Sequence, residues 1–282
     1  MASLIKTKTR LTSARSTQKV IKAMELVASS KIKRAREKAV GIEFYFNTTL
    51  DAMNNLYSYK KVKSLLLKGA GVNRTLIVSI TSDMGLCGAY NGNVIKKTLQ
   101  IMQQEGDYTN IVVGTKGISK LKYEKVELLN TYANIKTNGE QQLAIDISSA
   151  ILTKHLEIPF DSIKIVYTKF INPLVQEVKV IDLLHLEAMI DETATTADLV
   201  VEPNEERVFY QLFEQYVISV VFSAVLNSFA SEHAARRTSM EAANKNSLEL
   251  IDDLNLELNR IRQSMITQEI SEIIGGAEAL NN

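Results

Sequence analysis

The chain has 282 residues, of which 45% are hydrophobic and 23% are charged, and its formal net charge is +1. This is the composition of an ordinary soluble protein, long enough for one large or two modest domains. Cys87 is the single cysteine, which excludes an internal disulfide and fits a reducing compartment. The Lys-rich N-terminus has no apolar core segment, so we expect no signal peptide.

Long helices are predicted at both ends of the chain by the absence of residues that break helices. Residues 1–68 contain one glycine, Gly41, and no proline, while residues 204–274 contain neither. In a helix interior a glycine costs about 1 kcal/mol and a proline about 3 kcal/mol. We therefore expect a helix over residues 1–68 and another from about 205 to 274. Both are much longer than a globular helix of ~8–20 residues.

Apolar residues recur in both end regions at intervals of three, four or seven, which places them on one face of a helix. Two such helices at opposite ends of one chain pair most simply as an antiparallel coiled coil. Many stripe residues are small, so the coil is expected to be thin. We expect the last four residues of the C-terminal stripe to be exposed when the chain is alone. That stripe consists of Met240, Ala243, Ser247, Leu250, Leu254, Leu258, Ile261 and Met265.

The near-neutral net charge hides a strong asymmetry between the two ends. Residues 1–40 carry a net charge of +9, and residues 202–282 carry −7. In an antiparallel coil, opposite charges would face each other along part of its length. A basic helix can also bind nucleic acid or an anionic membrane. Residues 1–40 lack the interleaved aromatic side chains that stack on single-stranded bases, so an acidic protein partner is favoured over nucleic acid.

The middle of the chain is predicted to alternate strands and helices. β-branched, apolar runs predict strands, and Asn172 with Pro173 turns between the last two of them. The alternation favours a mostly parallel, Rossmann-like sheet with an antiparallel hairpin at its end. The expected strands are residues 75–81, 110–115, 162–170 and 175–183. The expected helices are residues 93–104, 117–123 and 140–156.

The predicted fold class is therefore α/β, with a long antiparallel coiled coil and a Rossmann-like central domain. We divide the chain into an N-terminal coiled-coil helix (1–68), a Rossmann-like α/β domain or foot (69–200) and a C-terminal coiled-coil helix (201–282). The most apolar stretch, residues 216–229, is shorter than the ~20 residues that span a bilayer and is interrupted by serine and asparagine. We therefore expect no membrane-spanning helix.

The loop at residues 81–93 lies between a strand and a helix, where phosphates often bind. It has three glycines, but it matches neither G-x-G-x-x-G nor G-K-[ST] and contains no lysine. A structural turn is therefore the expected role. Cys87 has no histidine near it in the sequence and is expected to be a packed thiol. His155, His185 and His233 are far apart, so neither a metal cluster nor a cofactor site is expected.

Five segments carry more specific patterns. They are residues 18–35 (QKVIKAMELVASSKIKRA), residues 80–91 (ITSDMGLCGAYN), Glu202-Pro-Asn204 with ASEHAAR at 230–236, and residues 261–277 (IRQSMITQEISEIIGGA). In this order they resemble the N-terminal signature, the S-D-[RK]-G-L-[CA]-G loop, the foot with the lower C-terminal helix, and the C-terminal signature of the gamma subunit of F-type ATP synthase. The dithiol insertion of chloroplast members is absent, so the resemblance is to the bacterial type.

This resemblance implies a central rotor shaft that performs no chemistry itself. In the family, the coiled coil sits inside a ring of three alpha and three beta subunits, and the beta subunits catalyse. The foot, together with the epsilon subunit, rests on a membrane c-type ring turned by ion flow. One copy per complex, transmission of torque between ring and head, and a peripheral position on the cytoplasmic face of the cell membrane are implied. No cofactor and no nucleic acid are implied.

The resemblance also implies which residues meet the beta subunits. Met24 lies where the family's N-terminal helix passes an acidic lever segment of beta. Arg262 and Gln263 match the pair with which the family catches a loop of beta. Thr267, Gln268 and Glu269 lie about one turn further along the helix. The bases near Met24 are Lys19, Lys22, Lys31, Lys33 and Arg34. The residues implied in the foot, near epsilon and the ring, are Glu202, Asn204 and Glu205.

Three alternatives stay open at this stage. Met84 stands where the family has a basic residue, and His233 replaces a commoner glutamine. Arg237, Ser239 and Ile261 also depart from the family pattern. These changes leave room for the shaft of a specialised F-type-like rotary ATPase that is not coupled to ordinary ion-driven synthesis. A coiled-coil scaffold without rotation is the second alternative. A small nucleotide-binding enzyme that uses the loop at 81–93 is the third.

Overall fold

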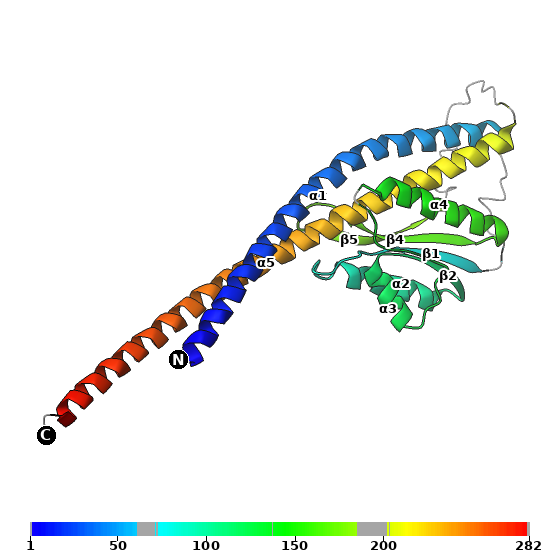
Figure 1. Ribbon diagram of the computed structural model, residues 1–282. Coiled ribbons are helices and arrows are strands. Elements are labelled where there is room, and N and C mark those ends of the chain that lie inside the picture. The colour runs from blue at the N-terminus through cyan, green and yellow to red at the C-terminus, as the bar shows by residue number, and fades with distance from the viewer. Residues whose placement is uncertain are drawn as a thin grey trace. The chain divides into compact units, whose positions relative to one another are not determined.

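The computed structural model describes residues 2–60, 71, 73–136, 138–184, 202 and 204–280 (Figure 1). The chain divides into two compact units. The first is Met1–Val27 with Arg237–Asn282, and the second is Ala28–Arg236. The elements in chain order are α1 (Ala2–Lys60), β1 (Arg74–Ile80), α2 (Tyr90–Gln104), β2 (Asp107–Val113), α3 (Thr115–Tyr123), β3 (Asn130–Tyr132), α4 (Glu140–Glu157), β4 (Ser162–Phe170), β5 (Gln176–Asp182) and α5 (Glu205–Leu280).

The predicted elements are confirmed in type and order, with differences at their ends. The C-terminal helix does not stop at 274 but continues through both following glycines to Leu280. Glycine costs only about 1 kcal/mol in a helix, and no proline follows. β3 is an additional strand that sequence analysis missed, because three residues show no periodicity. Residues 61–68 of the predicted first helix lie outside the described residues. Our division at 68/69 and 200/201 stays a prediction.

The second unit contains a five-stranded sheet in the order β3-β2-β1-β4-β5. β1 pairs in parallel with β2 and β4, and β2 pairs in parallel with β3. β4 and β5 are antiparallel. The turn between them is held by Asn172, whose Oδ1 accepts hydrogen bonds from the backbone N–H groups of Leu174 (2.9 Å) and Val175 (2.8 Å). The predicted mixed sheet with a terminal hairpin is confirmed.

Helices cover both faces of this sheet (Figure 1). Alternate residues of β1 enter two separate cores, so the strand is apolar almost throughout, as expected for a parallel strand buried on both faces. Val78 packs in the core shared with α4 and α5, which contribute Ile147 and Phe213. Ile77 packs in the core shared with α2 and α3, which contribute Val94 and Leu121.

α1 and α5 run antiparallel within each unit. In the first unit, Gln18 Nε2 donates to Asn244 Oδ1 (2.9 Å) and Thr7 Oγ1 donates to Glu257 Oε1 (3.3 Å). Residue numbers therefore rise on one helix as they fall on the other. In the second unit, the Tyr45 hydroxyl donates to Gln215 Oε1 (2.6 Å). The predicted antiparallel pairing is confirmed.

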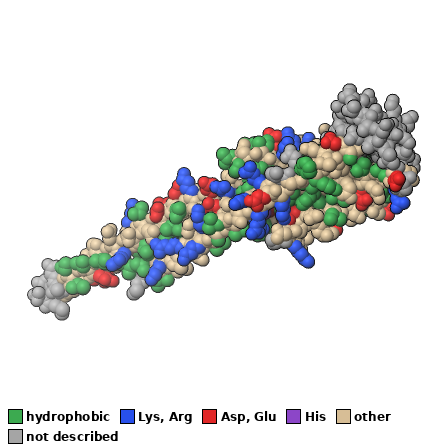
Figure 2. Space-filling model, turned by 90° about the horizontal axis from the view of Figure 1, so that it is seen from above, with side chains coloured by type: hydrophobic (Ala, Val, Ile, Leu, Met, Phe, Trp, Pro, Cys, Tyr) green, Lys and Arg blue, Asp and Glu red, His purple; other side chains and the backbone are tan. Residues whose placement is uncertain are grey.

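The exposed apolar residues of the first unit differ from those predicted. Leu254 is buried, with 3% of its surface exposed, and Leu258, Ile261 and Met265 are half-buried. They are covered because the start of α1 lies beside this part of α5. Other apolar residues of α5 are exposed, among them Leu248, Leu250 and Leu256. Apolar exposure continues at the end of the helix, where Figure 2 shows apolar side chains. The exposed residues there are Ile266, Ile270, Ile273 and Ile274.

The apolar part of α5 is longer than the sequence analysis predicted. An 18-residue window within Arg207–Ile274 reaches a mean hydropathy of 1.4, enough by length and composition to cross a membrane. The window is 56% buried inside the protein. Phe209, Phe213 and Tyr216 from this region belong to the core against the sheet. The apolarity of α5 is therefore that of a core helix.

Candidate functional site

The loop at 81–93 begins with a close approach between two strand ends. The Thr81 hydroxyl donates to the Val113 carbonyl (2.6 Å) and accepts from the Gly117 backbone N–H (2.9 Å). A Cβ on Gly114, where φ is +93°, would lie 2.4 Å from the Thr81 carbonyl oxygen, and one on Gly117 would lie 2.4 Å from Thr81 Oγ1. Glycine is required at both positions, because backbone and side chain leave no room for a methyl group.

Asp83 ties this loop to two neighbouring segments. Its Oδ1 accepts from the backbone N–H (3.0 Å) and the hydroxyl (2.8 Å) of Thr115, and its Oδ2 accepts from the N–H of Ile135 (3.0 Å). Burial acts to raise the pKa of Asp83, but hydrogen bonds from the Ile135 and Thr115 backbone outweigh it and hold the pKa below its usual value. The carboxylate is therefore charged and fully engaged in holding the loop.

Arg236 of α5 clamps the tip of the loop. Its Nη2 donates to the carbonyl oxygens of Met84 (3.1 Å) and Gly85 (3.2 Å), and its Nη1 donates to Glu232 Oε1 (2.6 Å). Arg236 is 5% exposed and Glu232 is 7% exposed, so the ion pair is buried. Burial raises the pKa of Glu232 although the Arg236 charge opposes this. The clamp fixes the backbone of the loop against α5.

The same tip presents apolar side chains to solvent. Met84 is 60% exposed and Leu86 is 62% exposed. Leu86 has a φ of 61°, a left-handed conformation that a branched L-residue rarely adopts. Strained backbone persists only where the surroundings hold it, and such positions cluster at functional sites. The sequence analysis did not predict this exposed tip. The feature of the sequence that could have indicated it is an apolar residue set between two glycines.

Cys87 is a packed thiol, as predicted. It is 2% exposed, its Sγ lies 3.8 Å from Ser82 Oγ, and the Asn91 Nδ2 donates to it at 3.3 Å. Burial raises its pKa, so the thiolate that a nucleophile needs is disfavoured. The part of the chain that is described holds no group of three or more His, Cys, Asp or Glu placed to bind a metal.

The predicted contact residues of the N-terminal helix fall in both units. Met24 is half-buried, and Lys19 and Lys22 are exposed. The Lys22 ammonium lies 3.0 Å from the Glu25 carboxylate. These three residues belong to the first unit, whereas Lys31 and Arg34 belong to the second. Figure 2 shows the Lys and Arg side chains along the paired terminal helices, interspersed with apolar ones.

The predicted catch residues all lie on the exposed surface of α5. Arg262, Gln263, Thr267 and Glu269 are exposed. The Thr267 hydroxyl donates to the Gln263 backbone carbonyl (3.0 Å), and Arg262 makes no ion pair with a described residue. The Arg262 guanidinium and the Gln263 side-chain amide both lie on the exposed surface of α5 and are therefore available to a partner protein.

The predicted foot residues lie at the start of α5. Glu202 is exposed, and Glu205 is the first residue of the helix. Asn204 caps the helix, because its Oδ1 accepts from the backbone N–H of Arg207 at 2.9 Å. The sequence analysis did not predict that Asn204 caps the helix. Residues 185–200 of the predicted foot lie outside the described residues.

Comparison with known proteins decides the family. The profile of the ATP synthase family matches residues 3–280. The ATP synthase gamma chain of Clostridium novyi is 39% identical over 282 residues, which cover 99% of this chain and 98% of that protein. That of Halothermothrix orenii is 37% identical over 279 residues, covering 97% of each. The chain belongs to the ATP synthase gamma chain family.

Solved structures agree with membership of the gamma chain family. The chain resembles one in the central stalk and c-ring of the Tetrahymena thermophila mitochondrial ATP synthase, with 29% identity and a TM-score of 0.65. This match covers 79% of this chain and 99% of that one. A chain from the Euglena gracilis mitochondrial ATP synthase shares the fold at 18% identity, with a TM-score of 0.69 and coverage of 99% and 95%. Gamma chains are central-stalk subunits, so the sequence-based assignment is confirmed.

Proposed function

We propose that this gamma chain is the rotating central shaft of an F-type ATP synthase. It transmits torque between a membrane c-type ring, turned by protons or sodium ions, and a catalytic head of three alpha and three beta subunits. One copy is present per complex. The complex lies on the cytoplasmic face of the cell membrane, which the chain meets only through its partners. Similarity along the whole length of the chain to bacterial gamma chains carries the proposal.

The architecture of the terminal helices supports this role. A shaft has to resist twisting, and α1 and α5 are paired over long spans without proline. Four isoleucines remain exposed at the end of α5, namely Ile266, Ile270, Ile273 and Ile274. Exposed apolar surface that extends beyond the helix pair is typical of a segment that another protein covers. The surrounding alpha and beta subunits are the cover that we propose.

The mechanism follows from the asymmetry of such a shaft. The head presents the same contact segment three times, while α1 and α5 differ in charge and shape. Each beta subunit therefore meets different side chains at any moment. A contact that stabilises one conformation of beta more than another shifts that subunit's equilibrium by the difference in contact free energy. One turn takes every catalytic site through the same series of affinities.

We assign the contacts with beta to residues on both helices. Met24, Lys19 and Lys22 face the acidic lever segment, to which exposed lysines are complementary. The catch on α5 consists of Arg262, Gln263, Thr267 and Glu269, of which Arg262 can form a bidentate pair with a carboxylate. Glu202, Asn204 and Glu205 lie at the foot, near the epsilon subunit and the ring. We assign the exposed tip at Met84 and Leu86 as a further contact with a partner subunit.

The chain itself catalyses nothing in this proposal and holds no cofactor. The loop at 81–93 is held by hydrogen bonds within the chain, which involve Asp83 and Arg236. Hydrolysis and synthesis of ATP take place on the beta subunits.

Coexpression with alpha and beta subunits tests the proposal. We expect one copy of this chain to copurify with three of each subunit, and only the assembled complex to hydrolyse ATP. Asp83→Asn and Cys87→Ser should leave the turnover of the assembled complex within about threefold, because neither residue touches a reacting group. A thousandfold loss of turnover in an intact complex, or ATP hydrolysis by the chain alone, would overturn the proposal.

A further inference from the structure

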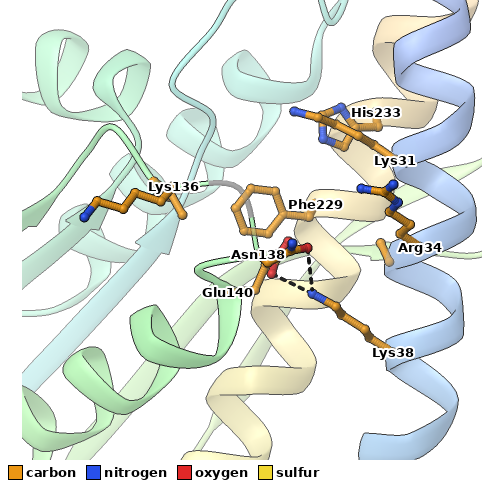
Figure 3. Close-up of a pocket in the computed structure, with 10 residues that line it drawn as sticks. Lys31, Arg34, Lys38, Lys136, Asn138, Glu140, Phe229 and His233 are labelled. Carbon is orange, nitrogen blue, oxygen red and sulfur yellow. Dashed lines mark hydrogen bonds and ion pairs between the residues drawn. The ribbon is translucent and has the colours of Figure 1, made fainter.

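The second unit contains a hollow that is lined by residues of both terminal helices (Figure 3). Its volume is about 90 Å³, and it lies between α1, α5 and the segment that joins β3 to α4. Its walls combine cationic side chains from α1 with an aromatic ring and a histidine from α5. The residues on which the argument rests are Lys31, Arg34, Lys38, Glu140, Phe229 and His233.

The charges around this hollow are unbalanced. Lys38 is neutralised, because its ammonium lies 2.9 Å from the carboxylate of Glu140. Among the described residues that line the hollow, Glu140 is the single carboxylate. Lys31 and Arg34 make no ion pair with a described residue. Figure 3 shows both extending from α1 toward the α5 side of the hollow. Two cations therefore share a recess whose lining offers them no described carboxylate of their own, although the charge of Glu232, which is paired with Arg236, also acts on Lys31.

His233 adds a directed hydrogen-bond donor. Its Nδ1 lies 3.1 Å from Nη1 of Arg236, and a guanidinium only donates, so Nδ1 accepts and Nε2 carries the proton. The ring is 8% exposed, lines the hollow and has no partner for Nε2 among the described residues. Burial, with help from Arg236 and Lys31, lowers the pKa of His233 to about 3. The imidazole is therefore neutral, and the positive surroundings that keep it so also favour an anion.

The apolar wall of the hollow strengthens the interaction of its cations with a bound anion. The Phe229 ring lies 6.5 Å from the His233 ring, centroid to centroid, at an interplanar angle of 24°. Ala35 is buried beside the same hollow. A charge interaction beside apolar groups is screened less than one in open water. The recess thus offers two cations and one N–H group in surroundings of reduced polarity.

We propose that this hollow binds an oxyanion of the phosphate class. Lys31 and Arg34 supply charge-assisted hydrogen bonds, and His233 Nε2–H supplies a neutral one. The volume admits a phosphate group rather than a folded segment of a partner, and the net charge rejects a cation. Inorganic phosphate and the terminal phosphate of a nucleotide share this chemistry. The proposal does not rest on the shaft function, because none of the residues that form the site is among those assigned above to contacts with other subunits.

Thermal unfolding of the full-length chain at low protein concentration tests this site. The probes are inorganic phosphate, pyrophosphate and ATP, each against sodium chloride at equal ionic strength. A ligand that binds only the folded state raises the midpoint of unfolding as its concentration passes the Kd. The test variant is Lys31→Gln with Arg34→Gln. Lys8→Gln with Arg10→Gln is the control, because it removes the same charge from exposed positions of the same helix.

We expect phosphate or pyrophosphate to raise the midpoint of the wild type and of the control variant equally. The apparent Kd of the test variant should rise at least about tenfold, since two charge-assisted hydrogen bonds are lost. His233→Phe, which keeps both cations, should weaken binding less. A response to ATP alone would assign the site to nucleotides, a response to phosphate and pyrophosphate without ATP would assign it to free phosphate, and a response to all three would assign it to a phosphate group whatever carries it. Equal responses of the test and control variants, or none beyond that of sodium chloride, would overturn the proposal.

Discussion

At the scale of single residues, Arg236 holds together the most specific local structure in the chain. Its guanidinium joins two backbone carbonyls of the loop at 81–93 to Glu232 on its own helix. Both carbonyls belong to residues distant from Arg236 in the sequence, since Met84 precedes it by 152 positions. The exposed tip at Met84 and Leu86 therefore depends on a buried cation far along the chain.

Arg236→Ala should destabilise the second unit strongly. The change leaves the Glu232 carboxylate buried without its partner and leaves two carbonyls without donors. Removal of one member of a buried ion pair typically costs about 3–5 kcal/mol. Arg237→Ala is the matched control, because Arg237 is exposed and surface changes usually stay within about 0.5 kcal/mol. Urea unfolding of both variants measures the difference. Equal midpoints would show that the clamp does not stabilise the fold.

His233 should make stability dependent on pH. Its pKa is about 3 in the folded chain and 6.5 when unperturbed, so below pH 6.5 the unfolded chain binds the extra proton. Stability therefore falls as the pH drops from about 6.5 toward 3, by up to about 1.4 kcal/mol per pH unit. The neighbouring Glu232, whose pKa burial raises, acts in the opposite direction.

His233→Gln isolates this contribution, because an amide oxygen can still accept from Arg236 but does not titrate. The free energy of unfolding of wild type and variant, measured between pH 7.5 and about 5, gives the test. The stability of the wild type relative to the variant should decrease by about 2 kcal/mol over this range. A difference that stays constant with pH would contradict the assignment of a neutral, buried His233.

At the scale of elements, the sequence predicted the regular structure well and the contacts poorly. Helices α1 and α5 follow from the absence of proline, and β1 follows from a run of β-branched residues, because these signals are local. β3 is too short to show a period. The tip at Leu86 and the hollow beside His233 depend on residues that are distant in sequence. Motif resemblance placed Arg262 and Gln263 on a helix, and exposure in the structure is compatible with the role proposed for them.

The catch on α5 can be tested by a paired substitution. We expect Arg262→Ala with Gln263→Ala to leave assembly with alpha and beta intact but to slow ATP hydrolysis. A charge-assisted hydrogen bond contributes about 1.5–3 kcal/mol, which corresponds to roughly ten- to a hundredfold in rate if it forms in only one rotary state. Asp252→Ala with Asp253→Ala, exposed on the same helix, should do much less. Equal, wild-type-like rates for the two variants would mean that the catch is not used.

At the scale of the whole molecule, two compact units share two helices. The first unit consists only of the paired ends of α1 and α5, and the second adds the sheet with its covering helices. A chain built this way has few residues in loops along its terminal pair and concentrates its loops around the sheet. This division suits the function that we propose, in which the helix pair would meet the catalytic head and the sheet unit would meet the other stalk subunits.

We propose that this chain turns inside the catalytic ring, and ATP-driven rotation of the assembled complex is the measurement that separates a turning shaft from a static scaffold. A visible probe is attached to an exposed position of α2 or α3 on this chain, and the ring of alpha and beta subunits is fixed to a surface. We predict one-directional rotation that requires ATP and advances in steps of one third of a turn. A complex that assembles and hydrolyses ATP while the probe stays still would contradict it.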